Sequence, residues 1–184
     1  MALFGLLGRG RHERAGFALY TAAVGAARDP VFYERLGVPD TLDGRFDLVG
    51  LYTVLLIRRL RATPPPGGDV AQAVFDAMFS DMDINLRELG VGDMTVSKRV
   101  RAMWEAFHGR ATAYDPPLAA GDMAAMEAAV IRNVYRESEH PGAHGVVQIA
   151  FAQGAHLDRV PPAELAAGKV TFLSPASILA EQAA

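Results

Sequence analysis

The sequence predicts an all-α protein that folds as a single-domain irregular bundle of about six to eight helices. Along its 184 residues, apolar side chains recur three and four positions apart, and glycines and prolines separate these periodic segments. No convincing pair of alternating segments indicates a β-hairpin. A chain of this length suits one domain and removes roughly 70% of its unfolded surface from water, which is enough to build a core.

Capping and breaking residues bound the expected helices. Asp29 and the following proline begin the second helix, and Gly37 ends it. Residues 64–68 cannot continue a helix, and Asp69 is expected to cap the next one. The segment 145–157 is expected to be helical, although its first residues taken alone would also fit a strand. The expected helices cover residues 13–28, 31–36, 45–61, 69–89, 93–109, 123–134, 145–157 and 161–168.

The third of these helices is expected to lie at the centre of the bundle. From Leu48 to Ile57 it is apolar almost all round, which is typical of a helix buried on every side. Outside the helical domain, residues 13–175, we expect two further parts. Residues 1–12 form an apolar and basic N-terminal segment, and residues 176–184 form an alanine-rich tail that frays.

Composition narrows the function classes. The 18 Lys and Arg against 21 Asp and Glu give a formal charge of −3, so we expect no sequence-specific nucleic-acid binding. The chain has no cysteine, which excludes thiolate nucleophiles and zinc–thiolate or iron–sulfur sites. No apolar run approaches the roughly 20 residues of a membrane-spanning helix, and no secretory signal is evident. These features predict a cytoplasmic protein.

Catalytic and metal-binding motifs are also missing from the sequence. His140 and His144 have a metal-ligand spacing, but Pro141 and Gly142 interrupt a helix there and no third ligand is evident. No serine stands in a nucleophile elbow, and no phosphate-binding loop is present. The sequence therefore predicts neither an enzyme nor a bound metal or cofactor.

A series of acidic residues offers two interpretations. Asp81, Asp83 and Asn85 resemble the start of a calcium loop, but the turn glycine and the bidentate glutamate are absent and the stretch lies in a helical stripe. These residues are either the solvated flanks of a helix, with an Asp83–Arg87 pair, or an acidic rim around a binding surface.

At the N-terminus, apolar residues next to a basic cluster fit either membrane contact or a disordered end packed on the core. The candidate membrane-contact residues are Leu3, Phe4, Leu6, Leu7, Arg9, Arg11 and Arg14.

Three motifs in series resemble the signature of the ubiquinol–cytochrome c chaperone family. They are Phe32–Asp47 (FYERLGVPDTLDGRFD), Phe79–Asp93 (FSDMDINLRELGVGD), and Val96–Val100 followed by Phe107–Arg110 and Tyr114. The resemblance is good from about Ala15 to Tyr114 and looser afterwards. It implies a helical assembly chaperone that binds immature cytochrome b and supports biogenesis of ubiquinol–cytochrome c reductase, respiratory complex III.

The resemblance also implies partners. These are newly made cytochrome b, the cytoplasmic face of the inner membrane as a peripheral site, and the ribosome by family analogy alone. An alternative is a membrane-surface scaffold without chaperone activity. A small-molecule enzyme using Asp81 and Asp83 is less expected, because side chains two residues apart on a helix point about 200° from each other.

Carried over by position, the resemblance implies partner-binding residues in each motif. They are Asp40, Thr41, Arg45 and Asp47, then Asp81, Asp83, Arg87 and Asp93, and finally Lys98, Arg99 and Arg110. Structural roles compete at these positions, since several fit helix caps and Gly109–Arg110 fits the end of a helix. Antiparallel packing of the helices on either side of the proline loop would bring the first two motifs to one end of the bundle.

Membrane contact by the N-terminal segment leads to a first testable prediction. Deletion of Met1–Arg11 is expected to reduce sedimentation with anionic vesicles, because each basic residue near anionic lipid adds about 1 kcal/mol. Binding of the intact protein is expected to fall as salt rises, since salt screens this attraction. Equal binding by the intact and truncated proteins would contradict the contact.

Overall fold

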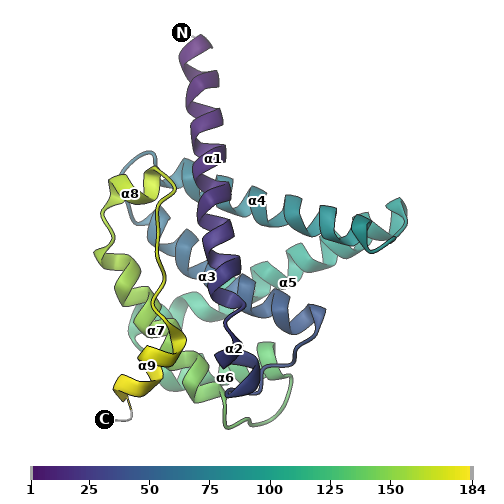
Figure 1. The fold of residues 1–184 in the computed structure, drawn as a ribbon, viewed down its shortest axis with the longest axis vertical. Helices are drawn as coiled ribbons and strands as arrows, with labels where there is room; N and C mark the ends of the chain where they lie inside the picture. The colour runs from purple at the N-terminus through teal and green to yellow at the C-terminus, as the bar shows by residue number, and fades with distance from the viewer. Residues whose placement is uncertain (1, 183–184) are drawn as a thin grey trace.

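The computed structural model describes the backbone of residues 2–182 and the side chains of residues 10–181. It confirms the all-helical, single-domain prediction, and no strand occurs among the described residues (Figure 1). Two of the segments are single turns of five residues, and one is a π-helix. The elements are α1 (Ala2–Ala27), α2 (Pro30–Glu34), α3 (Leu42–Arg61), α4 (Gly67–Glu88), α5 (Asp93–Ala120), α6 (Met123–Val130), the π-helix η1 (Ile131–Tyr135), α7 (Ala143–Arg159), α8 (Pro162–Ala166) and α9 (Pro175–Gln182).

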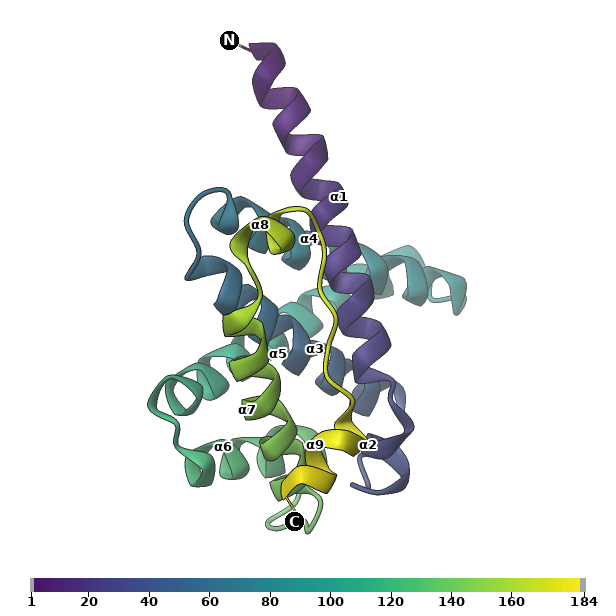
Figure 2. The same ribbon diagram turned by 60° about the vertical axis from the view of Figure 1, so that its left-hand side comes forward.

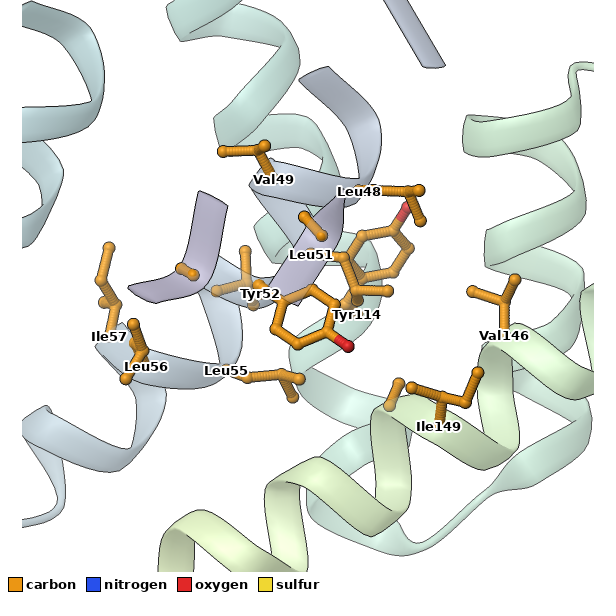
Figure 3. Packing of buried hydrophobic residues seen from close by; sticks show 14 of the residues in the cluster. Leu48, Val49, Leu51, Tyr52, Leu55, Leu56, Ile57, Tyr114, Val146 and Ile149 are labelled. Atoms are coloured by element: carbon orange, nitrogen blue, oxygen red, sulfur yellow. The ribbon is translucent and has the colours of Figure 1, made fainter. Parts of the chain in front are cut away.

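Helix α3 is the centre of the bundle, as its sequence predicts. Every residue from Leu48 to Ile57 is buried, and α1, α4, α5 and α7 all pack against the helix. Its apolar side chains meet those of α5 and α7 in one continuous core, seen close by in Figure 3. The Thr41 side chain caps the helix by accepting a hydrogen bond from the Gly44 N–H at 3.1 Å.

Helix α1 crosses α4 at very close range. A Cβ atom on Gly16 would lie only 2.5 Å from backbone and side-chain atoms of Ala73, so glycine is required at this crossing. Toward the N-terminus the helix is unbroken as far as Ala2, and its first turns project from the body (Figures 1 and 2). The backbone therefore has no boundary at residue 12, where the sequence predicts the N-terminal segment to end.

Helices α4 and α5 form a long hairpin whose far end also projects from the body in both views. Helix α4 begins at Gly67, and Asp69 lies in its first turn without capping it, contrary to expectation. Helix α5 continues past Gly109 and contains two prolines before it ends at Gly121, which has a φ of 70°. The expected end near Gly109 is wrong because one face of α5, including Tyr114, packs into the core. That burial outweighs the helix cost of a glycine, about 1 kcal/mol.

The C-terminal segment is held by a buried amide. Gln153 of α7 donates to the Leu173 carbonyl at 2.8 Å and accepts from the Leu173 N–H at 3.1 Å, as a backbone partner would. The chain then enters α9, where Ile178 is buried. The tail predicted to fray over 176–184 is therefore helical to residue 182, and residues 183–184 lie outside the described part. The segment 145–157 lies within helix α7, so its first residues form no strand.

Candidate functional site

A buried carboxylate joins the first and third sequence motifs. Asp47 lies in the second turn of α3 and is fully buried. One of its oxygens is 2.5 Å from a guanidinium nitrogen of Arg110 on α5, and the other is 2.8 Å from one of Arg136. The guanidinium of Arg110 also lies over the Phe46 ring at 5.5 Å. Three distant parts of the chain therefore meet at one charge.

Arg136 reaches this site from an unusual backbone. It follows η1 and has a φ of 59°, the left-handed conformation, which a residue with a side chain rarely adopts. Its N–H donates to the Ile131 carbonyl at 2.8 Å, and its guanidinium donates to the Val134 carbonyl at 3.1 Å. The ion pair with Asp47 is thus part of what holds this turn in place.

Burial and charge act in opposite directions on the Asp47 carboxyl. Burial raises its pKa, and the positive charges of Arg110 and Arg136 lower it. Burial is the larger effect, and the resulting pKa is about 6. The carboxyl is therefore ionised at pH 7. Because Asp47 is fully buried and the Arg110 side chain is 12% exposed, neither residue is available to a partner in this conformation. Both predicted binding residues have a structural role here.

The other residues of the first motif lie at the surface. Asp40 and Arg45 form an exposed ion pair of 2.7 Å, and Arg45 lowers the pKa of the Asp40 carboxyl. Thr41 caps α3, as its position in the sequence allows. The loop is thus fixed by local contacts, and Asp40 and Arg45 are the members of this motif that a partner could reach.

The second motif lies on α4 and the turn after it. Asp81 accepts a hydrogen bond of 2.7 Å from the Tyr20 hydroxyl and so links α4 to α1. The predicted Asp83–Arg87 pair is present at 2.6 Å, and Arg87 also pairs with Asp93 across the turn. These residues lie inside or beside a continuous helix, so the likeness to a calcium loop has no structural counterpart.

The first two motifs share no polar contact. No hydrogen bond or ion pair between described side chains joins Asp40–Asp47 to Asp81–Asp93. The end of α4 lies out along the projecting hairpin, while the beginning of α3 lies in the body (Figures 1 and 2). The expectation that both motifs form one binding end of the bundle stays a prediction.

The end of the hairpin exposes apolar side chains that sequence reasoning did not identify. We call residues 83–94 the arm tip. Within it Ile84 is 52% exposed, Leu89 67% and Met94 82%. The apolar spacing along this helix runs through Phe79, Met82, Leu86 and Leu89, which predicts that Leu89 faces the core, but the hairpin carries Leu89 beyond the body and into solvent. Ile84 does not fall on that spacing, which was the available signal of an exposed apolar position.

Negative charge dominates the arm tip. Asp83 and Glu88 of α4 and Asp93, the first residue of α5, carry negative charge against the single guanidinium of Arg87. Beyond the arm tip on α5, Lys98 and Arg99 are exposed. The arm tip therefore combines exposed apolar groups with a carboxylate-rich border, an arrangement suited to holding a segment that is both apolar and basic.

The described residues offer no group of three or more metal-ligating side chains. His140 stacks on the Tyr135 ring at 3.7 Å, and His144 pairs with Glu127 at 3.0 Å, so the two histidines have different neighbours. Within residues 2–182, no helix combines the length and apolar character needed to cross a membrane.

Comparison with known proteins agrees with the motifs. The model of the family described as "Ubiquinol-cytochrome C chaperone" matches residues 34–172. The chain belongs to this family. The match includes α3, α4, α5 and α7, and with them the whole arm tip, Asp47 and both of its ion-pair partners. Members of the family are chaperones and assembly factors, in agreement with the resemblance.

Two curated relatives extend the comparison. Ubiquinol-cytochrome-c reductase complex assembly factor 1 of Xenopus laevis is 24% identical over 120 residues, or 65% of this chain and 60% of the relative. Protein CBP3, mitochondrial, of Saccharomyces cerevisiae is 29% identical over 150 residues, or 78% of this chain and 44% of the relative. The chain thus spans between two fifths and three fifths of these longer proteins.

A solved structure confirms the fold. The crystal structure of the Cbp3 homolog from Brucella abortus superposes with a TM-score of 0.82 at 31% sequence identity. The superposition covers 96% of this chain and 98% of that one. The family members therefore share the all-helical architecture along nearly the whole chain.

The Asp47 ion pairs lead to a prediction about stability and pH. The folded-state pKa of Asp47 lies above the roughly 3.9 of an unfolded aspartate, so the folded protein binds more protons between these two pKa values. The contribution of Asp47 to the free energy of unfolding therefore falls as pH rises from about 4 to about 6. Removing Arg110 leaves the buried carboxylate less compensated and enlarges this loss. We expect Arg110→Gln to lower the free energy of unfolding by about 3 kcal/mol at pH 7.5, and by clearly less at pH 5.

The matched control is Arg101→Gln, because Arg101 is 82% exposed and pairs with Glu105 at the surface. Chemical denaturation at both pH values should give a change of less than about 1 kcal/mol that does not depend on pH. A cost of Arg110→Gln as small as that of the control would show that Asp47 does not hold the three segments together.

Proposed function

We propose that this protein is an assembly chaperone that binds immature cytochrome b and supports biogenesis of ubiquinol–cytochrome c reductase. The family description and the name of the Xenopus laevis relative point to assembly of this complex. The single observation that carries the proposal for this chain is the arm tip, where Ile84, Leu89 and Met94 are exposed beside three carboxylates. Exposed apolar side chains of this size at a projecting end favour contact with another protein.

The charge of the arm tip fits a membrane protein as client. Cytoplasmic loops of membrane proteins carry an excess of lysine and arginine next to apolar spans. A segment at such a boundary offers both apolar side chains to Leu89 and Met94 and cations to Asp83, Glu88 and Asp93. The carboxylates would orient the segment and raise its association rate, while the apolar contacts provide most of the affinity.

The arm tip is also built to keep its shape without a client. Arg87 pairs with both Asp83 and Asp93 and so ties the end of α4 to the beginning of α5. Leu86 and Val96 are buried between the two helices. A surface that is already ordered loses less conformational entropy on binding. Among the residues that the family resemblance implies, we therefore assign client binding to Asp83, Arg87 and Asp93.

A second role is proposed for the N-terminal end. Helix α1 projects from the body (Figure 2), and the exposed side chains of Arg11 and Arg14 line a cavity of about 580 Å³ together with His12. Basic residues so placed would contact anionic headgroups and hold the protein at the cytoplasmic face of the inner membrane. The side chains of Leu3, Phe4, Leu6, Leu7 and Arg9 lie outside the described residues. A ribosome contact rests on family analogy alone.

Client binding at the arm tip is tested by removing its apolar groups. The double variant Leu89→Ser, Met94→Ser is expected to reduce the cytochrome b recovered with the tagged protein several-fold, because both side chains lose their apolar contacts. Recovery is measured by affinity purification and mass spectrometry from cells that assemble complex III. The melting temperature is expected to stay nearly unchanged, since both residues are exposed.

Two control variants distinguish the arm tip from the rest of the surface. Leu42→Ser removes a leucine that is 50% exposed at the beginning of α3, and Arg45→Glu reverses a charge of the first motif. Both are expected to recover cytochrome b as the unchanged protein does. Full recovery by the arm-tip variant, or an equal loss in the controls, would contradict the assignment.

A further inference from the structure

A groove lies between α3, α4 and α5, away from the arm tip and with different chemistry. Its volume is about 740 Å³. Val54 and Ile57 of α3 and Phe75 of α4 line it together with Phe107 of α5. Trp104 of α5 also lines it and is 45% exposed. An apolar groove that leaves a tryptophan in solvent has the features of a binding site for another molecule.

Trp104 is held in a fixed position at the groove. Its ring packs against His108, one turn along α5, with ring centroids 3.9 Å apart. The Nδ1 atom of His108 lies 3.0 Å from the Trp104 carbonyl, and Phe75 contacts the imidazole edge-on at 5.6 Å between centroids. Because the indole is already fixed, it loses little entropy when a partner binds. Well-packed tryptophans of this kind are enriched among the residues that dominate binding energy at interfaces.

The charges that stay unpaired at the groove and beside it are positive. Arg58 and Arg61 line the groove from the last turn of α3, and Arg58 pairs with Asp115 of α5 at 2.7 Å. Arg61 is exposed and forms no ion pair with any described side chain. Farther along α5, Lys98 is exposed, while Arg101 pairs with Glu105 at 3.1 Å. Arg61 and Lys98 thus contrast with the carboxylate-rich arm tip.

The groove continues into an exposed stripe of α5. At 100° per residue, Lys98, Arg101, Trp104, His108 and Asp115 fall within a 120° sector of the helix. The opposite side of the helix carries the buried Val96, Phe107 and Tyr114. The stripe runs for roughly 25 Å, the length of a helix of about 17 residues. Glu105, the partner of Arg101, falls in the same sector, so the stripe is mostly polar and the apolar side chains are those of the groove. An apolar groove that opens onto a polar stripe of this length matches one amphipathic helix in the helix-in-groove mode of recognition.

We infer that this groove binds an amphipathic helix of a second protein partner, with apolar side chains against Trp104 and carboxylates facing Arg61 and Lys98. The basic segments proposed as client at the arm tip would be repelled here, so the two surfaces select different partners. The inference does not depend on the identity of the client, because it rests on the shape and charge of the groove alone.

The test uses the only tryptophan of the chain as its reporter. Two designed helical peptides share the same leucine positions, and one carries glutamates on its flanks where the other carries lysines. The glutamate peptide is expected to shift or quench Trp104 emission at micromolar concentration and to bind at least about tenfold more tightly than the lysine peptide. Equal affinity for both peptides, or no change in emission up to millimolar concentration, would overturn the inference.

Charge reversal in the groove gives the second arm of the test. The double variant Arg61→Glu, Lys98→Glu is expected to reverse the preference toward the lysine peptide, with a melting temperature close to that of the unchanged protein. Asp83→Lys, on the arm tip, is expected to leave glutamate-peptide binding as it was. An unchanged preference in the groove variant would overturn the inference, as would a reversal caused by Asp83→Lys. A larger emission shift with anionic vesicles than with the peptide would also overturn it, because the occupant would then be a membrane.

Discussion

The buried charge of Asp47 is the constraint on which the other features of this fold depend. Its carboxylate forms ion pairs with guanidinium groups of α5 and of the turn after η1, which are 63 and 89 positions away in the sequence. A buried carboxylate is tolerable only when it is compensated, so α3, α5 and the η1 turn must come together in one arrangement. That arrangement fixes the middle of α5 against the central helix. The rest of α5 is then free to extend outward with α4 as the projecting hairpin.

The two proposed binding surfaces lie on this hairpin and have opposite charge. The arm tip combines Ile84, Leu89 and Met94 with carboxylates. The groove combines Trp104 and the apolar residues beside it with arginines. Because both surfaces include parts of α4 and α5, a protein bound at one lies close to a protein bound at the other. This arrangement would let one protein hold a client beside a second factor, which suits a family whose members serve assembly of a respiratory complex.

Features set by local chemistry could be predicted from the sequence. The unbroken apolar run Leu48–Ile57 predicted the central helix, and the four-residue spacing predicted the Asp83–Arg87 pair. Features that depend on distant partners could not. Nothing in the local pattern shows that Arg110 and Arg136 meet Asp47, or that Gln153 holds Leu173. The same limit explains why α5 passes through Gly109 and why Leu89 lies in solvent. In both cases tertiary packing, not the local residue pattern, decides the outcome.

The proposed contact between the arm tip and cytochrome b can be tested by site-specific photo-crosslinking. A photoreactive amino acid is placed at position 89 of the arm tip, at position 104 of the groove, or at position 173, where Leu173 is 38% exposed on the C-terminal segment. The cells are irradiated while complex III is being made. We expect adducts with cytochrome b from position 89, adducts with a different protein from position 104, and none from position 173. Cytochrome b adducts from position 173 but not from position 89 would contradict the account.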